Sequence, residues 1–154
     1  DHIAGVADLQ KAFAELELLC PAKDAFMLLD AAANLSAPFG FDVTAPPADQ
    51  LILPGETLTL SESRWEVLDT SGHTDGGVSY YCARAGLVLV GDALFAASIG
   101  RTDFPGASGV RLIENIRRNL LSLPDDTRVL PGHGPETTIS AEKAYNPFLR
   151  DSGL

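Results

Sequence analysis

The stretch SGHTDGGVSYYCARAGLVLVGD, residues 71–92, decides how this chain folds. It holds two apolar runs, VSYYCA at 78–83 and GLVLVGD at 86–92, which a tight Ala-Arg-Ala-Gly connection joins. Short apolar runs that are rich in β-branched and aromatic residues and bounded by turn residues are typical of consecutive strands. The alternating runs TLTL and RWEVLD, within residues 56–69, precede the glycine-rich turn and predict further strands of the same sheet.

Helices are expected before this block of strands. The apolar side chains at helical spacing predict a helix over residues 6–20, with Asp8 in its first turn and Pro21 ending it; these side chains are Leu9, Phe13, Leu16 and Cys20. Residues 23–34 predict a second, short helix, and a loop punctuated by proline and glycine follows it.

Helices are also expected after the strands. Residues 108–123 predict a helix behind a Ser108 N-cap, with one apolar face made of Val110, Ile113, Ile116, Leu120 and Leu123. A short strand, RVLP, and a last helix after Ser140 complete the chain. This order of elements indicates one α/β domain over residues 1–154, in which helices cover the strands.

The composition narrows the class of protein. An apolar content of 45% over 154 residues is enough to build a core. The net charge of −10 repels phosphate backbones and anionic lipids, so we expect neither a nucleic acid nor a membrane partner. Cys20 and Cys82 lie far apart without metal-type spacing, which indicates buried residues in a reducing compartment and hence a cytoplasmic protein.

The chain has three histidines, and none lies inside an apolar periodic run. His73 in SGHTDGG and His133 in PGHGP each follow a predicted strand, and glycines there let the backbone turn sharply. A lone loop histidine is more often an ordinary surface residue. Asp92, however, ends the apolar run LVLV and would emerge at the end of a buried strand. Imidazoles and a carboxylate gathered at strand ends favour a site for zinc, iron or manganese.

Four motifs, in this order, carry a resemblance to a known family: DHIAG at 1–5, SGHTDGG at 71–77, GDALF at 91–95 and PGHGP at 131–135. Together they resemble the metal-binding motifs of metallo-β-lactamase-fold hydrolases, most closely the small glyoxalase II-like (hydroxyacylglutathione hydrolase-like) members. The stretches SIGRTDFPG, PGHGPETT and NPFL strengthen the resemblance, which covers essentially the whole chain.

The resemblance implies an αββα sandwich and a centre for two divalent metal ions, zinc first, with iron or manganese as alternatives. Asp1, His2 and His133 would bind one ion, His73 the other, and Asp92 would bridge the two. The first family motif is HxHxDH, and only its final Asp-His is present, as Asp1 and His2. We therefore expect a chain truncated at its N-terminus, which lacks the N-terminal strands of the first sheet and leaves one metal site incomplete.

Such a centre predicts metal-dependent hydrolysis. Two divalent ions close together can hold a hydroxide at neutral pH and polarise a carbonyl. A thioester is a natural target, because its thiolate leaving group, with a pKa near ~8.5, needs little protonation. We expect hydrolysis of a small thioester of the hydroxyacylglutathione type through a metal-bound hydroxide, with Asp1 and Asp92 as catalytic residues. Asp1 would also orient the nucleophilic water.

Three further residues are candidates for substrate binding. Arg101 and Asp103 are expected to form an ion pair that braces the loop, and substrate contact by Arg101 is the alternative. Lys143 and Tyr145 lie, with Asn146, where glyoxalase II-like enzymes gather groups for the glutathione carboxylates. The alternative is an ordinary amphipathic helix whose Tyr145 and Phe148 pack inward.

Other functions remain open at this point. A mononuclear-iron persulfide dioxygenase shares the fold and a GRTDF-like stretch, although His133 suits a second metal. Phosphodiester cleavage is disfavoured by the acidic balance, and a shared fold does not make β-lactams the substrate. The chain could also be a non-catalytic remnant that binds one metal.

Overall fold

The computed structural model describes residues 1–150. The chain divides into two compact units, Asp1–Leu53 and Pro54–Leu154, and each is described by itself. The prediction of a single domain stays a prediction.

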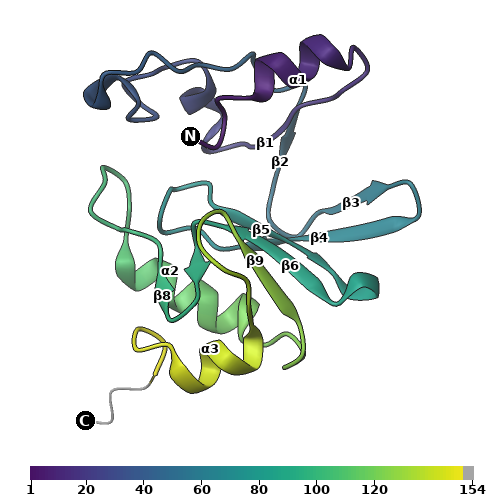
Figure 1. Cartoon of the computed structure of the whole chain (residues 1–154), viewed down its shortest axis with the longest axis vertical. Helices are drawn as coiled ribbons and strands as arrows, with labels where there is room; N and C mark the ends of the chain where they lie inside the picture. The colour runs from purple at the N-terminus through teal and green to yellow at the C-terminus, as the bar shows by residue number, and fades with distance from the viewer. Residues whose placement is uncertain (151–154) are drawn as a thin grey trace. The chain divides into compact units, whose positions relative to one another are not determined.

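The second unit is built on one mixed sheet, and Figure 1 labels β3, β4, β5, β6 and β9. Its strands, in chain order, are β3 (Thr57–Leu60), β4 (Ser63–Asp69), β5 (Val78–Cys82), β6 (Leu87–Gly91), β9 (Arg128–Pro131) and β10 (Thr137–Thr138). They lie in the order β10-β9-β6-β5-β4-β3, and neighbours are antiparallel except for the parallel pair β6 and β9. The sequence prediction of consecutive strands in one sheet is therefore confirmed.

Two helices cover one face of this sheet. They are α2 (Gly109–Asn115), continued by a π turn over Ile116–Leu120, and α3 (Ile139–Tyr145). The core between helices and sheet consists mainly of fully buried side chains: Val88, Val90 and Val129 from the strands, and Leu112, Ile116, Leu120 and Ile139 from the helices. Burying each of these stabilises the fold by roughly 1.5–3 kcal/mol.

For the predicted helix over 108–123, the structure confirms the N-cap at Ser108 but changes which residues form the buried face. The Ser108 side chain accepts a hydrogen bond from the Arg111 amide, as an N-cap does. Val110 is 70% exposed, so its placement on the buried face is wrong. Leu112 takes that place, because the short α-helical turn directs residues 112 and 116 towards the sheet.

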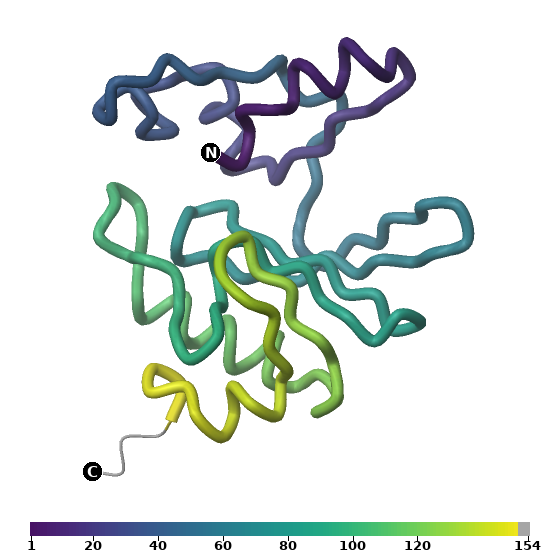
Figure 2. Tube along the Cα trace, viewed as in Figure 1, coloured from purple at the N-terminus to yellow at the C-terminus, as the bar shows by residue number. Residues whose placement is uncertain are grey.

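A small hairpin and its connections complete the second unit. Strands β7 (Leu94–Phe95) and β8 (Ser98–Ile99) pair with each other directly after β6. Figure 2 traces the chain from this hairpin through α2 to α3.

The first unit contains little regular structure. It has α1 (Val6–Ala12), the 3-10 turns Ala25–Leu28 and Ala37–Phe39, and the parallel pair β1 (Leu19–Pro21) and β2 (Gln50–Ile52). Its small core holds Cys20, Leu28 and Ala45.

Both predicted helices of this unit are wrong in extent. Residues 13–20 leave the helix because Leu19–Pro21 pairs with Gln50–Ile52, and the Leu18 amide donates to the Asp49 carboxylate at 2.7 Å. Residues 29–34 form turns instead of continuing a helix, because the Asp30 carboxylate accepts hydrogen bonds from the backbone amides of Ala32 and Ala33. Helical spacing alone does not reveal such pairing over long sequence distances.

Both cysteines are buried and free, as expected. Burial raises the pKa of the Cys20 thiol, and the nearby Asp24 carboxylate raises it further. Among the described residues, no helix is long and apolar enough to cross a membrane.

Candidate metal centre

The loop SGHTDGG connects β4 to β5 and carries His73 at its tip. The loop closes through the hydrogen bond from the Thr70 amide to the Gly77 carbonyl and turns through the bond from the Gly72 amide to the Thr74 carbonyl. Gly72 has a φ of +143°, and a Cβ there would overlap the backbone of Leu112 in α2. Glycine is therefore required both for the turn and for the close approach of this loop to the helix.

The second unit brings three of the predicted ligands together at one edge of its sheet. His73 Nε2 lies 3.9 Å from Asp92 Oδ2, and His133 Nε2 lies 3.7 Å from the same oxygen. Asp92 follows β6 and His133 follows β9, and because these neighbouring strands run parallel, both side chains emerge at the same end.

The donor set fits a divalent transition metal ion. Two imidazole nitrogens and one carboxylate oxygen are ligands that zinc and iron accept. Both N···O distances are longer than a hydrogen bond. Two ligands that each lie about 2.1 Å from one tetrahedral zinc ion are roughly 3.3–3.6 Å apart, and the two observed distances are close to this value. The side chains of His73 and Asp92 are only 24% and 17% exposed, which limits competition from water.

The orientation of His73 is set by the backbone. Its Nδ1 lies 2.7 Å from the carbonyl oxygen of Arg101. A carbonyl only accepts hydrogen bonds, so Nδ1 carries a proton and donates it, and this orientation of the ring turns Nε2 towards Asp92. The ring also meets the edge of Phe104, with centroids 5.5 Å apart.

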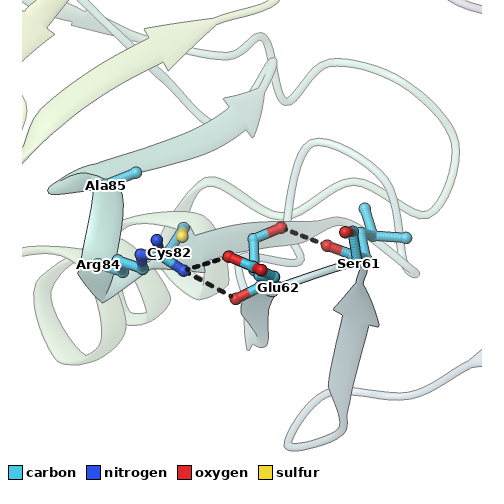
Figure 3. Close-up of a pocket in the computed structure, with 7 residues that line it drawn as sticks. Ser61, Glu62, Cys82, Arg84 and Ala85 are labelled. Atoms are coloured by element: carbon cyan, nitrogen blue, oxygen red, sulfur yellow. Dashed lines mark hydrogen bonds and ion pairs between the residues drawn. The ribbon is translucent and has the colours of Figure 1, made fainter.

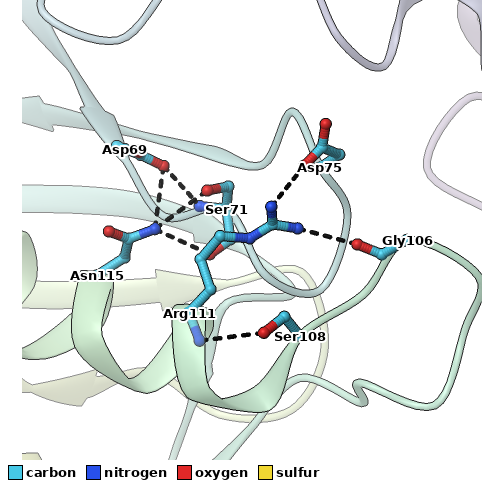
Figure 4. Close-up of polar contacts among 7 residues, drawn as sticks. All are labelled: Asp69, Ser71, Asp75, Gly106, Ser108, Arg111 and Asn115. Atoms are coloured by element: carbon cyan, nitrogen blue, oxygen red, sulfur yellow. Dashed lines mark hydrogen bonds and ion pairs between the residues drawn. The ribbon is translucent and has the colours of Figure 1, made fainter.

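The first turns of α2 support the loop that carries His73, as Figure 4 shows. The buried Asn115 amide donates to the Asp69 carboxylate at 3.2 Å and to the carbonyl and hydroxyl of Ser71 at 3.0 and 3.1 Å. Arg111 lies 2.7 Å from the Asp75 carboxylate and donates to the Gly106 carbonyl at 2.9 Å. These contacts hold both ends of the loop against the helix.

Asp1 and His2 belong to the first unit. Their side chains are exposed, and His2 Nε2 lies 3.7 Å from Asp1 Oδ1. Their predicted participation in the metal centre stays a prediction.

Arg101 and Asp103 form the predicted ion pair. Two nitrogens of the guanidinium donate to the two carboxylate oxygens at 3.0 and 2.8 Å, and the group lies over the Phe104 ring at 4.7 Å. The hydrogen bond from Arg101 lowers the pKa of Asp103, and the same bond raises the pKa of Arg101. The brace is thus present beside His73, while substrate contact by Arg101 stays a prediction.

The other substrate candidates lie on and after α3. Lys143 is paired with Asp125 at 2.6 Å, and Tyr145 is 76% exposed. Asn146 is fully buried and makes internal hydrogen bonds. Phe148 is half exposed, so the alternative that Tyr145 and Phe148 pack inward is wrong. The contacts that substrate would make with Lys143 and Tyr145 stay predictions.

Sequence reasoning did not identify the groups that support the ligands. The Arg101 carbonyl carries no side-chain signal at all. Asn115 had one available signal, because it is a polar residue between the apolar helix positions 112 and 116. A polar residue on the buried face of a helix usually has a specific partner.

A shallow hollow of about 440 Å³ lies at the opposite end of the sheet, shown in Figure 3. Arg84 spans it by donating to the carbonyl of Glu62 at 3.3 Å and pairing with its carboxylate at 3.6 Å. It is lined by the β3–β4 and β5–β6 turns and contains none of the predicted ligands.

The fold and the ligand set define a class of protein. The family model of the Metallo-beta-lactamase superfamily matches residues 1–133, so the chain belongs to this superfamily, whose members are in general metal-dependent hydrolases. The metallo-β-lactamase fold and the binding of divalent metal that it implies agree with the sequence prediction.

Individual relatives add detail. The probable metallo-hydrolase YqgX of Bacillus subtilis is 40% identical over 155 residues, which cover 100% of this chain and 73% of YqgX. The hydroxyacylglutathione hydrolase GloC of Haemophilus influenzae is 44% identical over 95 residues, or 62% of this chain and 45% of GloC.

Two solved structures are similar to this one. The BLEG-1 B3 metallo-beta-lactamase superposes with a TM-score of 0.92 at 38% identity, covering 97% of this chain and 72% of that chain. The protein TTHA1623, in a di-iron-bound form, superposes with a TM-score of 0.83 at 37% identity over the same shares.

Proposed function

We propose that this protein hydrolyses small thioesters of the hydroxyacylglutathione type at a centre for two divalent metal ions. One observation carries the proposal: the imidazoles of His73 and His133 both approach a single carboxylate oxygen of Asp92. A carboxylate between two imidazoles suits a bridge between two ions. The similarity to GloC supports the thioester as substrate.

The roles of the residues follow the resemblance of their motifs to the metal-binding motifs of this superfamily. His133, with Asp1 and His2, would hold one ion, His73 would hold the other, and Asp92 would bridge them. Zinc is the proposed metal, with iron or manganese as the alternatives. Bound divalent ions would supply polarisation of the thioester carbonyl and a lower pKa for water.

The chain's own groups direct the remaining steps. The Arg101 carbonyl holds His73 in the tautomer that presents Nε2, and the Asp1 carboxylate would accept the proton of the attacking water. The departing thiolate is stable near neutral pH and needs no dedicated acid. The proposed substrate is a small molecule in the cytoplasm, and the net charge of −10 disfavours nucleic acid or anionic membrane as a partner.

The test begins with elemental analysis of protein purified without added metal, followed by turnover of S-lactoylglutathione. Two zinc, iron or manganese ions per chain, with turnover lost by at least ~10³-fold in Asp92→Asn, would support the proposal. Asp126→Asn, in an exposed turn, is the matched control and should keep full turnover. No thioester turnover in the metal-loaded protein would refute it.

The role of Asp1 has its own variant. Asp1→Asn retains the shape of the side chain and removes the proton acceptor, so turnover should fall while the metal content stays the same. Wild-type turnover in this variant would contradict the proposed role.

β-Lactam hydrolysis is a second candidate, because the BLEG-1 structure is so similar. A chromogenic cephalosporin assayed beside the thioester separates the two activities. A single bound iron, with consumption of dioxygen and a persulfide, would instead assign the dioxygenase activity.

A further inference from the structure

A buried carboxylate that the proposed mechanism does not use lies in α3. Glu142 is only 3% exposed. Its oxygens accept hydrogen bonds from the backbone amide of Ala97 at 3.2 and 3.0 Å, from the Thr137 hydroxyl at 2.7 Å and from the side-chain amide of Asn146 at 2.7 Å. A buried carboxylate is costly unless such donors satisfy it, which indicates a specific role for the group.

The contacts of Glu142 converge on the turn of the β7–β8 hairpin. Ala97 has a φ of +57°, a conformation that a residue with a Cβ rarely adopts. Glu142 accepts from the amide of this residue, and Asn146 donates to the carbonyl of the next residue, Ser98, at 3.0 Å. The pair formed by Glu142 and Asn146 therefore clamps the hairpin in a turn that the backbone alone disfavours.

The hairpin leads directly to the metal centre. It begins just after Asp92, and at its end the Gly100 amide donates to the Ala93 carbonyl at 3.2 Å. The next residue is Arg101, whose carbonyl accepts the proton of His73 Nδ1. The hairpin thus joins the proposed bridging ligand to the acceptor that orients the other imidazole.

We infer that Glu142, supported by Asn146, is a positioning residue of the metal centre: by clamping the β7–β8 turn it places the Arg101 carbonyl that holds His73 in its metal-binding tautomer. The inference rests on the proposed function only for its second readout, which is zinc affinity. Its first readout, the state of the His73 ring, concerns the protein without metal.

The experiment compares Glu142→Ala, Glu142→Gln and Ile139→Val in the full chain. Glutamine keeps one oxygen for the Ala97 and Asn146 donors, and the Thr137 hydroxyl can rotate to accept from the new amide group. Ile139 is fully buried in the same helix, and its apolar side chain cannot hydrogen-bond to the hairpin turn, so Ile139→Val controls for a general loss of core packing.

The first measurement is the 15N spectrum of the His73 ring in metal-free protein. Wild type, Glu142→Gln and Ile139→Val should show one tautomer with the proton on Nδ1, and Glu142→Ala should show a mixture. The second measurement is zinc affinity, which should fall about 10- to 100-fold in Glu142→Ala and less than about threefold in the other two variants.

The outcomes separate the two proposals. A folded Glu142→Ala protein with an unchanged His73 tautomer would overturn the inference, and so would an Ile139→Val protein with the same mixture. If Glu142→Ala does not fold, the His73 tautomer is measured in Asn146→Ala instead, which removes the hydrogen bond to Ser98 and one donor to Glu142. Wild type that shows the single tautomer but binds none of zinc, iron or manganese would refute the proposed function and leave the positioning role standing.

Discussion

Replacing Gly100 by alanine should damage the metal centre, because this residue lies against two of its proposed ligands. A Cβ at this position would overlap the carbonyl oxygen of Asp92, and it would lie 3.0 Å from the carbonyl carbon of Asp92 and 3.3 Å from His73 Nδ1. The backbone of Asp92 cannot rotate out of the way of this Cβ, as the end of a flexible side chain could. The proposed bridging residue and the loop after β8 must therefore move apart.

The magnitude follows from the contact distances. Carbon atoms in favourable contact lie about 3.5–4.0 Å apart, and the overlap with the Asp92 oxygen is deep, so relief requires a shift of more than an ångström. Overpacking of this kind costs about 3 kcal/mol, which for a chain of this size lowers the melting temperature by roughly 6–12 °C. A misplacement of about 1 Å already costs about 100-fold, so the shift at Asp92 and at the Arg101 carbonyl that accepts from His73 should lower zinc affinity by at least about 100-fold.

The assay pairs thermal unfolding with competition for zinc by a chromophoric chelator. Gly109→Ala is the matched control, because its Cβ would lie 3.0 Å from the Thr102 hydroxyl, which belongs to a side chain that can rotate. The control should stay within about threefold of wild type in zinc affinity. If Gly100→Ala binds zinc like Gly109→Ala and melts at the same temperature, the reasoning from contact with Asp92 and His73 is refuted.

Three other predictions follow from contacts in the second unit. Asn115→Ala removes three hydrogen bonds from the buried amide and should destabilise the protein by about 2–3 kcal/mol in urea unfolding; no loss would contradict its role against the Ser71 loop. The lowered pKa of Asp103 means that its pairing with Arg101 stabilises the fold above the unfolded pKa of about 3.9 and is lost as pH falls through the folded value. Titration of the Asp103 carboxyl carbon by NMR should show that pKa returning to its ordinary range in Arg101→Gln. Zinc at a hundred times its dissociation constant should stabilise the protein by about 2.7 kcal/mol, and a chelator should remove this gain in a thermal melt.

Five strands of the main sheet and three of the proposed metal ligands were predictable because their signals are local. Strands β5 and β6 are short apolar runs between turn residues, β3 and β4 are alternating runs, and Asp92 marks the end of the run in β6. His73 and His133 are histidines beside glycines just after strands, and the structure places both near Asp92. For each of these strands and residues, the prediction used a sequence pattern that spans no more than about ten residues.

The rest depends on partners that are distant in the sequence. Residues 19–21 form a strand because residues 50–52 pair with them, and no periodicity within 6–20 records that pairing. The Glu142 carboxylate occupies a helix position that amphipathic reasoning assigns to solvent, but its donors come from Ala97, Thr137 and Asn146. Long-range hydrogen bonding of this kind appears in the folded chain and not in the order of its residues.

The parallel pairing of β6 with β9 also determines how this protein can vary. The spacing of Asp92 and His133 is set by the register of two adjacent strands, in which Leu89 lies opposite Leu130 and Gly91 opposite Pro131. Insertions in the exposed turn before β9, residues 124–126, would lengthen a connection without moving either ligand, whereas a slip of one residue would turn one ligand to the wrong face. That turn is thus open to evolutionary change, and the strand register is not.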